Sequence, residues 1–212
     1  MPKLKLIYFD LDGGRGEPAR LAMVVGGVPF EDYRFPFSEW PSLRDSTPFR
    51  AVPVLEIDGA PLSQSNAILR YVGKLGGLYP EDPLQAAYCD EVMDAVEDAM
   101  HQMAPSFGLK GEELKAAREK LVAGPLPFFI ERVGALLARG SNGYFADGRL
   151  TIADLKAFAW VKHLKSGLLD HVPADLVAQT APGLSDHCEK VRSEPSISEY
   201  YEQRNREQAK QS

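Results

Sequence analysis

Two groups of donor side chains in the first third of the chain could each bind a carboxylate. The first is Gln64 with Ser65, at the predicted start of a helix that continues through Tyr71. Ser63 or Ser65 can cap this helix, and free N–H groups and a positive dipole end at a helix N-terminus attract anions. On pattern alone, the stretch also fits an ordinary hairpin and helix with a capping serine.

The second group is Trp40 with Arg44, four residues apart in a segment, 36–51, that is rich in Pro, Ser and aromatic residues and is expected to form a loop. An indole N–H and a guanidinium are donors suited to a clamp on a carboxylate. The alternative is that neither residue binds a ligand: Trp40 anchors a loop and Arg44 is a solvated charge. The sequence leaves both interpretations open.

Between these groups, Val52-Pro53 lies at the entrance of a predicted hairpin. Proline has no backbone N–H, so a regular ladder does not claim the N–H and C=O of Val52, and an extended peptide could pair there. The strand that follows leads into Asp58-Gly59, a dipeptide that two-residue hairpins select because their central residues need positive φ.

The elements around these residues alternate between strand and helix. Residues 3–9 predict a strand in the middle of a sheet, and residues 30–35 predict the next strand. Between them, a helix has Pro18 near its first turn and is closed by Gly26-Gly27. This order predicts an α/β domain that ends near Tyr79-Pro80.

The loop before that first helix contains Gly13, Gly14 and Gly16. Their spacing does not match the Gly-x-Gly-x-x-Gly pattern of dinucleotide-binding loops. The sequence therefore argues against a Rossmann-type site.

From Pro83 onward the sequence predicts only helices. Apolar residues recur at helical spacing up to Met103, opposite an acidic face that is typical of solvent exposure. Thr151-Ile-Ala-Asp154 predicts a capping box with Asp in place of Glu. Further helices are expected over 112–122, over 128–138, from the capping box onward, over 184–193 and, as a short helix, over 197–206, with a polar tail after Tyr201.

Composition narrows the class of protein. The chain has 212 residues, 44% hydrophobic and 25% charged, and a formal net charge of −6. That charge argues against a nucleic-acid backbone or an anionic membrane as the principal partner. Cys89 and Cys188 form no Cys-x-x-Cys, which argues against dithiol exchange and a zinc site, and no metal site is expected. The N-terminus does not resemble a signal peptide, so we expect a cytoplasmic protein.

The stretch from Val52 to Ile68, with its Val-Pro entrance, Asp-Gly turn and Leu-Ser-Gln-Ser-Asn-Ala-Ile helix start, resembles the glutathione-binding segment of cytosolic glutathione transferases. With the Thr151–Asp154 box, the resemblance covers essentially the whole chain, and Tyr8-Phe9 is most similar to the tyrosine-type, sigma-like class. It implies an α/β plus all-α fold: a thioredoxin-like glutathione-binding domain over residues 1–80 and an all-helical domain carrying the electrophile pocket over residues 84–212.

The resemblance assigns roles to the candidate residues. Tyr8 would be catalytic, its hydroxyl donating to the sulfur of glutathione; otherwise it is an aromatic packed in the core. Lowering a thiol pKa of about 8.5 by about two units takes roughly 2.7 kcal/mol, within reach of one or two hydrogen bonds to a charged acceptor. The resemblance gives the glycyl carboxylate to Trp40 and Arg44, the cysteinyl amide to the backbone of Val52 beside Pro53, and the γ-glutamyl carboxylate to Gln64 and Ser65.

At three positions the sequence, or the length of the loop around the residue, differs from the pattern of the family. Arg44 stands where lysine is common, which keeps the charge and adds bidentate geometry. Ala51 stands where glutamine or lysine is usual, so one polar contact to the glycyl end is missing. Arg15 matches an arginine near the active-site sulfur of sigma enzymes, in a loop that carries one extra residue.

The resemblance also implies a homodimer, because Asp98 matches the aspartate that relatives supply from the opposite subunit to the γ-glutamyl ammonium. The pocket for the second substrate is expected between Tyr8, Phe9, Arg15 and the helical half. Its expected apolar walls, which fit a simple core equally well, are Met100, Met103, Phe107 and Trp160.

We therefore expect a glutathione transferase that activates the thiol of its co-substrate glutathione and adds it to hydrophobic electrophiles. One alternative is a non-enzymatic, crystallin-like or ligand-carrying relative, although Tyr8, Trp40 and Gln64 are all retained. Another is a glutathione-dependent prostaglandin isomerase.

Overall fold

The N-terminal strands form one four-stranded sheet in the order β2-β1-β3-β4 in the computed structural model, which describes residues 1–210. β1 pairs in parallel with β2 and antiparallel with β3, and β3 pairs antiparallel with β4. The first strand thus lies inside the sheet, as predicted. The strands are β1 (Leu4–Phe9), β2 (Glu31–Phe35), β3 (Val54–Ile57) and β4 (Ala60–Ser63).

The tight turn between β3 and β4 forms where the sequence places it. Asp58 and Gly59 have φ values of 51° and 86°, the left-handed conformations that such a turn needs. Pro61 lies on β4, an edge strand, where a missing N–H costs no ladder hydrogen bond.

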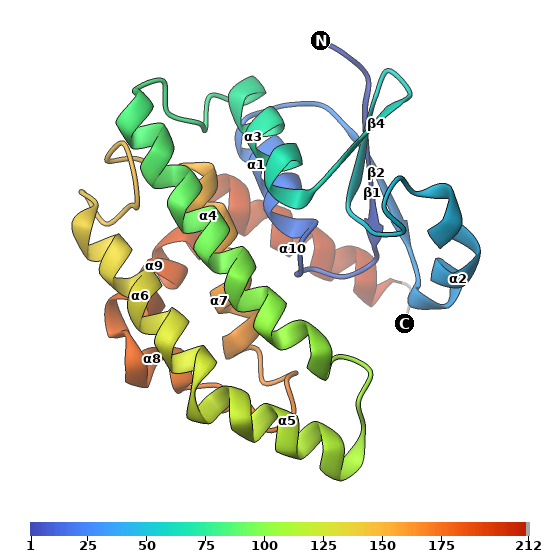
Figure 1. Ribbon diagram of the computed structural model, residues 1–212. Helices are drawn as coiled ribbons and strands as arrows, with labels where there is room; N and C mark the ends of the chain where they lie inside the picture. Colours follow the sequence, from blue (N-terminus) through green and yellow to red (C-terminus); the bar gives the residue numbers. More distant parts are fainter. Residues whose placement is uncertain (211–212) are drawn as a thin grey trace. The chain divides into compact units, whose positions relative to one another are not determined.

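Two helices, α1 (Glu17–Val25) and α3 (Ser65–Leu75), lie on one face of this sheet (Figure 1). They cover the buried side chains Leu4, Leu6 and Leu55. A Cβ on Gly26, which ends α1 as predicted, would lie 2.5 Å from the Cα of Gly76 at the end of α3. Glycine at this crossing therefore allows the two helix ends to approach closely.

The expectation of a plain loop over residues 36–51 is wrong in part. This segment contains the short helical turns η1 (Phe37–Glu39), α2 (Trp40–Leu43) and η2 (Arg44–Ser46). Ser42 and Ser46 donate to carbonyl oxygens three residues earlier, at 2.8 and 2.7 Å, and so support the turns locally.

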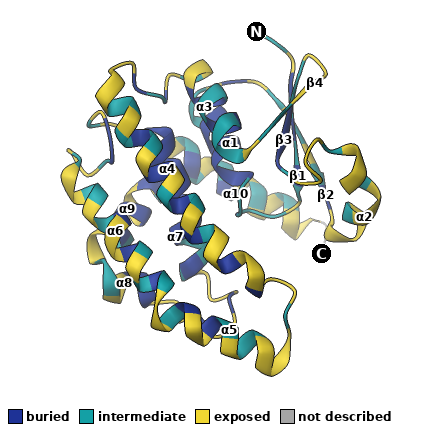
Figure 2. Cartoon of the chain, in the orientation of Figure 1, coloured by how far each residue is buried: buried dark blue, intermediate teal, exposed yellow. Residues whose placement is uncertain are grey.

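The second unit, residues 80–191, is helical. α7 is its central helix and is buried along most of its length (Figure 2). The capping box predicted from Thr151 and Asp154 is present at the start of α7. The helices are α4 (Pro83–Met103), α5 (Gly111–Ala123), α6 (Pro125–Arg139), α7 (Ile152–Lys165), α8 (Leu176–Thr180) and α9 (Pro182–Arg192), with a 3-10 turn, η3 (Ala104–Ser106), after α4.

The sequence predicts that the acidic face of α4 is solvent-exposed, but one of its residues has a buried partner. Glu97 accepts a hydrogen bond from the buried ammonium of Lys156 at 2.7 Å. The helix α8 was not expected from the sequence, which is understandable for an element of five residues. Cys89 and Cys188 are buried free thiols on α4 and α9.

The C-terminal segment differs from the predicted short helix and polar tail, because α10 (Pro195–Ala209) is one helix of 15 residues. The Tyr201 hydroxyl donates to Glu17 at 2.8 Å, and Arg204 pairs with Asp10 at 2.9 Å. These contacts place the segment from Arg192 onward with residues 1–79, whereas the sequence interpretation assigned it to the helical domain.

Length and composition alone would allow one segment, Gly111–Arg139, to cross a membrane. The chain breaks this segment into α5 and α6 at Gly124, and α6 carries Glu131 and Arg132. A single segment of this kind is weak evidence for membrane insertion.

Candidate functional site

Tyr8, near the end of β1, is held by the loop that follows it. Its side chain is 6% exposed, and its hydroxyl oxygen accepts a hydrogen bond from the backbone N–H of Arg15 at 2.9 Å. A phenol that accepts in this way still has its own proton to donate. Burial raises the pKa of Tyr8, although the N–H of Arg15 and the charges of Arg15 and Arg20 oppose the shift. The hydroxyl is therefore protonated at neutral pH and available as a donor.

The glycines of this loop have a structural reason that sequence reasoning missed. A Cβ on Gly16 would collide with the ring of Tyr8, and a Cβ on Gly14, whose φ is 66°, would lie 2.5 Å from the Tyr8 hydroxyl oxygen. The loop therefore closes around Tyr8 because two of its residues have no side chain.

A buried arginine under Tyr8 was also missed. Arg20 is fully buried on α1, and its guanidinium carbon lies 5.5 Å from the centroid of the Tyr8 ring. It donates to the carbonyl oxygens of Phe9 and Leu11 at 3.2 and 3.0 Å, directly after Tyr8 in the chain. The available signal was Glu17 three residues before Arg20 in the predicted helix, a spacing that lets the two side chains pair.

The sheet register brings three of the predicted residues into line. Ile7 pairs with Val54, and Val54 pairs with Ser63. Continuing both ladders by one position places Tyr8, Pro53 and Gln64 side by side at one end of the sheet. Residues that are far apart in the chain thus come together because β1, β3 and β4 are neighbours.

The entrance of β3 and the start of α3 complete this end of the sheet. The Val52–Pro53 peptide bond is cis, and Val52 lies outside the regular strand. The prediction that Ser63 or Ser65 caps α3 is wrong: the N-cap is Gln64, with φ of 73° and no side-chain capping hydrogen bond. Ser63 is the last residue of β4, and its buried Oγ has no partner among residues 1–210. The side chain of Gln64 therefore makes no capping hydrogen bond to the backbone of α3.

Trp40 joins Tyr8 through an aromatic cluster. The Phe9 ring lies 5.4 Å from that of Tyr8 and 5.5 Å from that of Trp40, both with edge-to-face geometry. Arg44, at the start of η2, is exposed. The structure therefore fixes the indole of Trp40 but leaves the Arg44 side chain on the surface.

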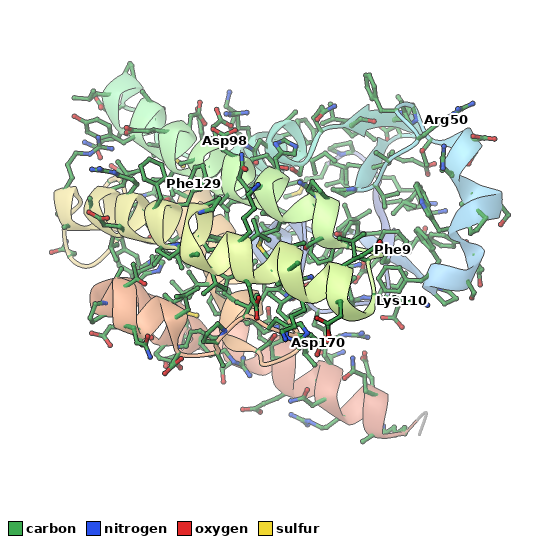
Figure 3. All side chains as sticks on the ribbon, turned by 60° about the horizontal axis from the view of Figure 1, so that its bottom comes forward. Phe9, Arg50, Asp98, Lys110, Phe129 and Asp170 are labelled. Atoms are coloured by element: carbon green, nitrogen blue, oxygen red, sulfur yellow. The ribbon has the colours of Figure 1, made fainter. Side chains whose placement is uncertain are left out.

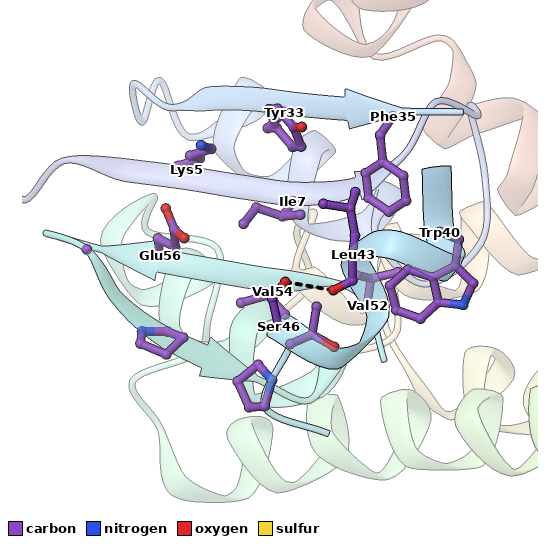
Figure 4. A pocket seen from close by; sticks show the side chains of 14 residues that line it. Lys5, Ile7, Tyr33, Phe35, Trp40, Leu43, Ser46, Val52, Val54 and Glu56 are labelled. Carbon is purple, nitrogen blue, oxygen red and sulfur yellow. Dashed lines mark hydrogen bonds between the residues drawn. The ribbon is translucent and has the colours of Figure 1, made fainter. Parts of the chain in front are cut away.

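A cavity of about 360 Å³ lies on the sheet face beneath α2 and η2 (Figure 4). Trp40 and Val52 lie at one end of it, and Lys5 and Glu56 at the other. Tyr8 does not line this cavity. Trp40 and Val52 thus border a second space besides the end of the sheet where Tyr8 lies.

The remaining predicted residues belong to the helical unit. Asp98 is exposed on α4 (Figure 3). Of the expected apolar walls, Met103 and Trp160 are buried, Met100 is half-buried, and Phe107 is 54% exposed. Of these four side chains, Phe107 is therefore the most exposed at the surface of the helical unit.

Comparisons with known proteins cover most of the chain. The model of the glutathione S-transferase N-terminal domain matches residues 4–74, and that of the C-terminal domain matches residues 97–204. Glutathione S-transferase 1 of Ascaris suum is 34% identical in an alignment 212 residues long, and the alignment covers 96% of this chain and 98% of that protein.

Solved structures show the same similarity. Prostaglandin synthase D of Nilaparvata lugens superposes with a TM-score of 0.84 at 29% identity, over 95% of this chain and 98% of that one. Monomeric Na-GST-3 of the hookworm Necator americanus superposes with a TM-score of 0.80 at 30% identity, over 95% and 97% of the two chains. The chain therefore belongs to the glutathione S-transferase family, among members of sigma- and nu-like type, and is a transferase that takes glutathione as its co-substrate.

Proposed function

We propose that Tyr8 activates the thiol of glutathione for addition to hydrophobic electrophiles. The observation that carries this proposal is the hydrogen bond from the Arg15 N–H to the Tyr8 oxygen, which leaves the phenol proton to donate outward. A neutral donor beside the sulfur favours the thiolate and so lowers the pKa of the thiol. The thiolate then attacks an electrophilic carbon of the acceptor.

The rest of the tripeptide would be held by the residues at the same end of the sheet. The γ-glutamyl carboxylate lies at the start of α3, where the side chains of Gln64 and Ser65 and the positive end of the helix dipole favour an anion. The cysteinyl amide pairs with the backbone of Val52, beside Pro53. Trp40 and Arg44 donate to the glycyl carboxylate, with Trp40 held in place by Phe9 and Phe35.

Arg15 is assigned a second, electrostatic role. Its backbone already holds the Tyr8 hydroxyl, and its positive charge is one of those that oppose the raised pKa of Tyr8. The same charge favours an anionic sulfur bound next to that hydroxyl.

The acceptor is an apolar electrophile, for which Met100, Met103, Phe107 and Trp160 of the helical unit supply apolar surface. A prostaglandin endoperoxide is the second candidate substrate, favoured by the similarity to prostaglandin synthase D of Nilaparvata lugens. A cytoplasmic role in detoxification fits the first candidate. We further propose a homodimer in which Asp98 of one copy meets the γ-glutamyl ammonium bound by the other.

The direct experiment is retention of the whole protein on immobilised glutathione, followed by turnover of four acceptors: an aryl halide, an alkenal, an organic hydroperoxide and a prostaglandin endoperoxide. Conjugation of the halide or the alkenal supports the transferase proposal. Isomerisation of the endoperoxide without conjugation supports the second candidate. Retention with no turnover of any acceptor would indicate a non-enzymatic relative.

A further inference from the structure

The cavity beneath α2 and η2 contains one acidic side chain, that of Glu56, at the end opposite Trp40 (Figure 4). Glu56 lies on β3 and is half-buried. Its carboxylate forms neither a hydrogen bond nor an ion pair with any residue of the described range 1–210. Partial burial costs a carboxylate some of its hydration, and no cation of that range compensates for the loss. This end of the cavity therefore favours a positively charged ligand.

The other charged residue that lines the cavity is Lys5, which lies directly opposite Glu56 in the ladder between β1 and β3. Its ammonium turns towards β2 instead, where it lies 3.5 Å from the Glu31 carboxylate and 4.6 Å from the centroid of the Tyr33 ring. The Glu31 side chain is 49% exposed, and an ion pair at the surface contributes little free energy. Lys5 is therefore a competitor for Glu56, and a ligand that binds there must supply more than a charge.

Between Glu56 and Trp40 the sheet provides an apolar floor for the cavity. Ile7 pairs with Val54 in the middle of this floor. Phe35 lies at its far end beside Trp40, with 6.1 Å between the two ring centroids. In the ladders, the row of Phe35 is four residues along β1 from the row of Glu56, a distance of about 13 Å. The floor therefore fits a ligand with a cationic head and an apolar body of about that length.

The side of the cavity formed by α2 and η2 adds no competing polar group. Leu43 supplies an apolar side chain, and the hydroxyls of Ser46 and Thr47 donate to carbonyl oxygens three residues earlier, at 2.7 and 2.8 Å. The volume of about 360 Å³ lies in the range of pockets that hold small organic ligands. Apolar walls around a single unpaired carboxylate are thus the chemistry that this cavity offers to a ligand.

We propose that this cavity binds an amphipathic amine, whose ammonium pairs with the Glu56 carboxylate and whose apolar body lies along Ile7 towards Phe35 and Leu43. The site lies within residues 1–79, and Tyr8 does not line it. The proposal goes beyond the transferase reaction, because it adds a class of ligand, organic cations, that the activation of glutathione does not require.

The test is titration calorimetry on the full chain, in the absence of glutathione. It compares 4-phenylbutylamine, which is protonated at neutral pH as a lysine side chain is, with 4-phenylbutan-1-ol, a neutral molecule of the same shape. We expect the amine to bind about tenfold more tightly or better, the range of one charge-assisted hydrogen bond. Butylamine should bind at least about tenfold more weakly than 4-phenylbutylamine, because without the ring it leaves much of the apolar floor uncovered.

Two variants should change the preference for the amine over the alcohol in opposite directions. Glu56→Gln should abolish the preference, whereas Lys5→Gln should increase it, because this substitution removes the competing cation. The matched control is Glu39→Gln, a change at an exposed acid of η1 that does not line the cavity. This control alters the net charge as Glu56→Gln does and should leave the preference unchanged.

Three results would overturn the proposal. Equal binding of 4-phenylbutylamine and 4-phenylbutan-1-ol to the unaltered protein would do so without any variant, so the test survives even if Glu56→Gln does not fold. Equal binding of butylamine and 4-phenylbutylamine would mean that a carboxylate alone, and not the cavity, holds the amine. A loss of preference in Glu39→Gln as large as that in Glu56→Gln would assign the effect to the net charge of −6 instead of to this site.

Discussion

The backbone N–H of Arg15 donates to the hydroxyl oxygen of Tyr8 at 2.9 Å, so the loop after β1 folds back onto the strand that precedes it. Gly14 and Gly16 permit this closure because neither has a Cβ to meet the Tyr8 side chain. The loop thereby fixes the direction in which the phenol proton can point. The oxygen is already engaged by a donor, and the hydroxyl keeps its own proton to donate.

Replacing Tyr8 with Phe removes that proton and keeps the ring. The pKa of enzyme-bound glutathione should rise towards that of the free thiol, by about two units, and the rate near neutral pH should fall by up to roughly a hundredfold. The loss should shrink as pH rises, because the thiolate then forms without help. Ultraviolet absorbance of the thiolate in the binary complex, measured against pH, reports the shift directly.

The control for this change is Tyr33→Phe, which deletes a hydroxyl from β2 of the same sheet and should leave the titration unchanged. Superimposable titration curves for Tyr8→Phe and the unaltered protein would mean that Tyr8 only packs. The activating donor would then have to be sought elsewhere, first at Arg15.

Gly16→Ala tests the closure of the loop rather than the hydroxyl itself. The new Cβ would overlap the Tyr8 ring, so the ring or the loop must move, at a cost of about 1–3 kcal/mol in the free energy of unfolding. The bound thiol should titrate at higher pH than in the unaltered protein, although Tyr8 is still present. Gly183→Ala, where nothing lies within 4 Å of the added Cβ, is the matched control. An unchanged thiol pKa would show that the loop does not position Tyr8.

Trp40→Phe and Arg44→Ala test the glycyl end of the proposed site. Both residues would hold a carboxylate remote from the sulfur, so they stabilise the ground and transition states alike. Each substitution should raise the KM for glutathione, by about tenfold where one charge-assisted hydrogen bond is lost, and change kcat little. Steady-state kinetics at saturating acceptor separates the two constants. A loss confined to kcat at saturating glutathione would contradict this role.

Much of the fold follows from local sequence signals. Asp58-Gly59 predicts its turn because few dipeptides adopt two positive φ values, and Thr151 with Asp154 predicts the start of α7 because the box satisfies backbone groups within one turn. Both signals depend on neighbouring residues alone, so sequence is sufficient to find them.

The C-terminal helix shows where such reasoning stops. The residues after Tyr201 are polar and look like a tail, yet α10 extends to Ala209 and Arg204 pairs with Asp12, which is 192 residues earlier. No local pattern reports a partner at that distance. The same holds for Arg20, whose contact with the Tyr8 ring depends on how α1 packs on the sheet.

The predicted serine cap of α3 was wrong for a different reason. Both serines near its start are good capping residues, and the sequence alone could not show that the chain turns into the helix at Gln64 with a positive φ. This unusual backbone conformation, which non-glycine residues rarely adopt, belongs to the proposed binding site for the γ-glutamyl carboxylate.

The network between α10 and the loop after β1 predicts a pH dependence. Burial acts to raise the pKa of Asp12, but the charges and hydrogen bonds of Arg204 and Arg34 outweigh it and hold that pKa below its usual value of 3.8. A carboxylate whose pKa is depressed by folding stabilises the fold above its unfolded pKa and loses this effect as pH falls through the folded pKa. The contribution of Asp12 is therefore full above about pH 4 and is lost in stronger acid.

Urea unfolding of Asp12→Asn should accordingly show a loss of about 1–3 kcal/mol at pH 7, in the range for a hydrogen bond to a charged group, that shrinks below pH 4. Glu199→Gln, a change at an exposed acid of α10, should have little effect at either pH. A deficit for Asp12→Asn that is the same at pH 7 and pH 3 would contradict the ionic origin of the contact.

The last prediction concerns Asp98, which is exposed on α4 and is proposed to act in a second copy of the chain. Asp98→Ala should weaken glutathione binding by about 1.5–3 kcal/mol, because it removes a carboxylate from the γ-glutamyl ammonium. Asp186→Ala, the same change at an exposed position of α9, should leave binding intact. Analytical ultracentrifugation supplies the second measurement, since the effect requires a dimer, whereas the relative Na-GST-3 is described as monomeric. A monomer that binds glutathione with unaltered affinity after Asp98→Ala would rule out the shared site and leave Gln64 and Ser65 to hold the γ-glutamyl group within a single chain.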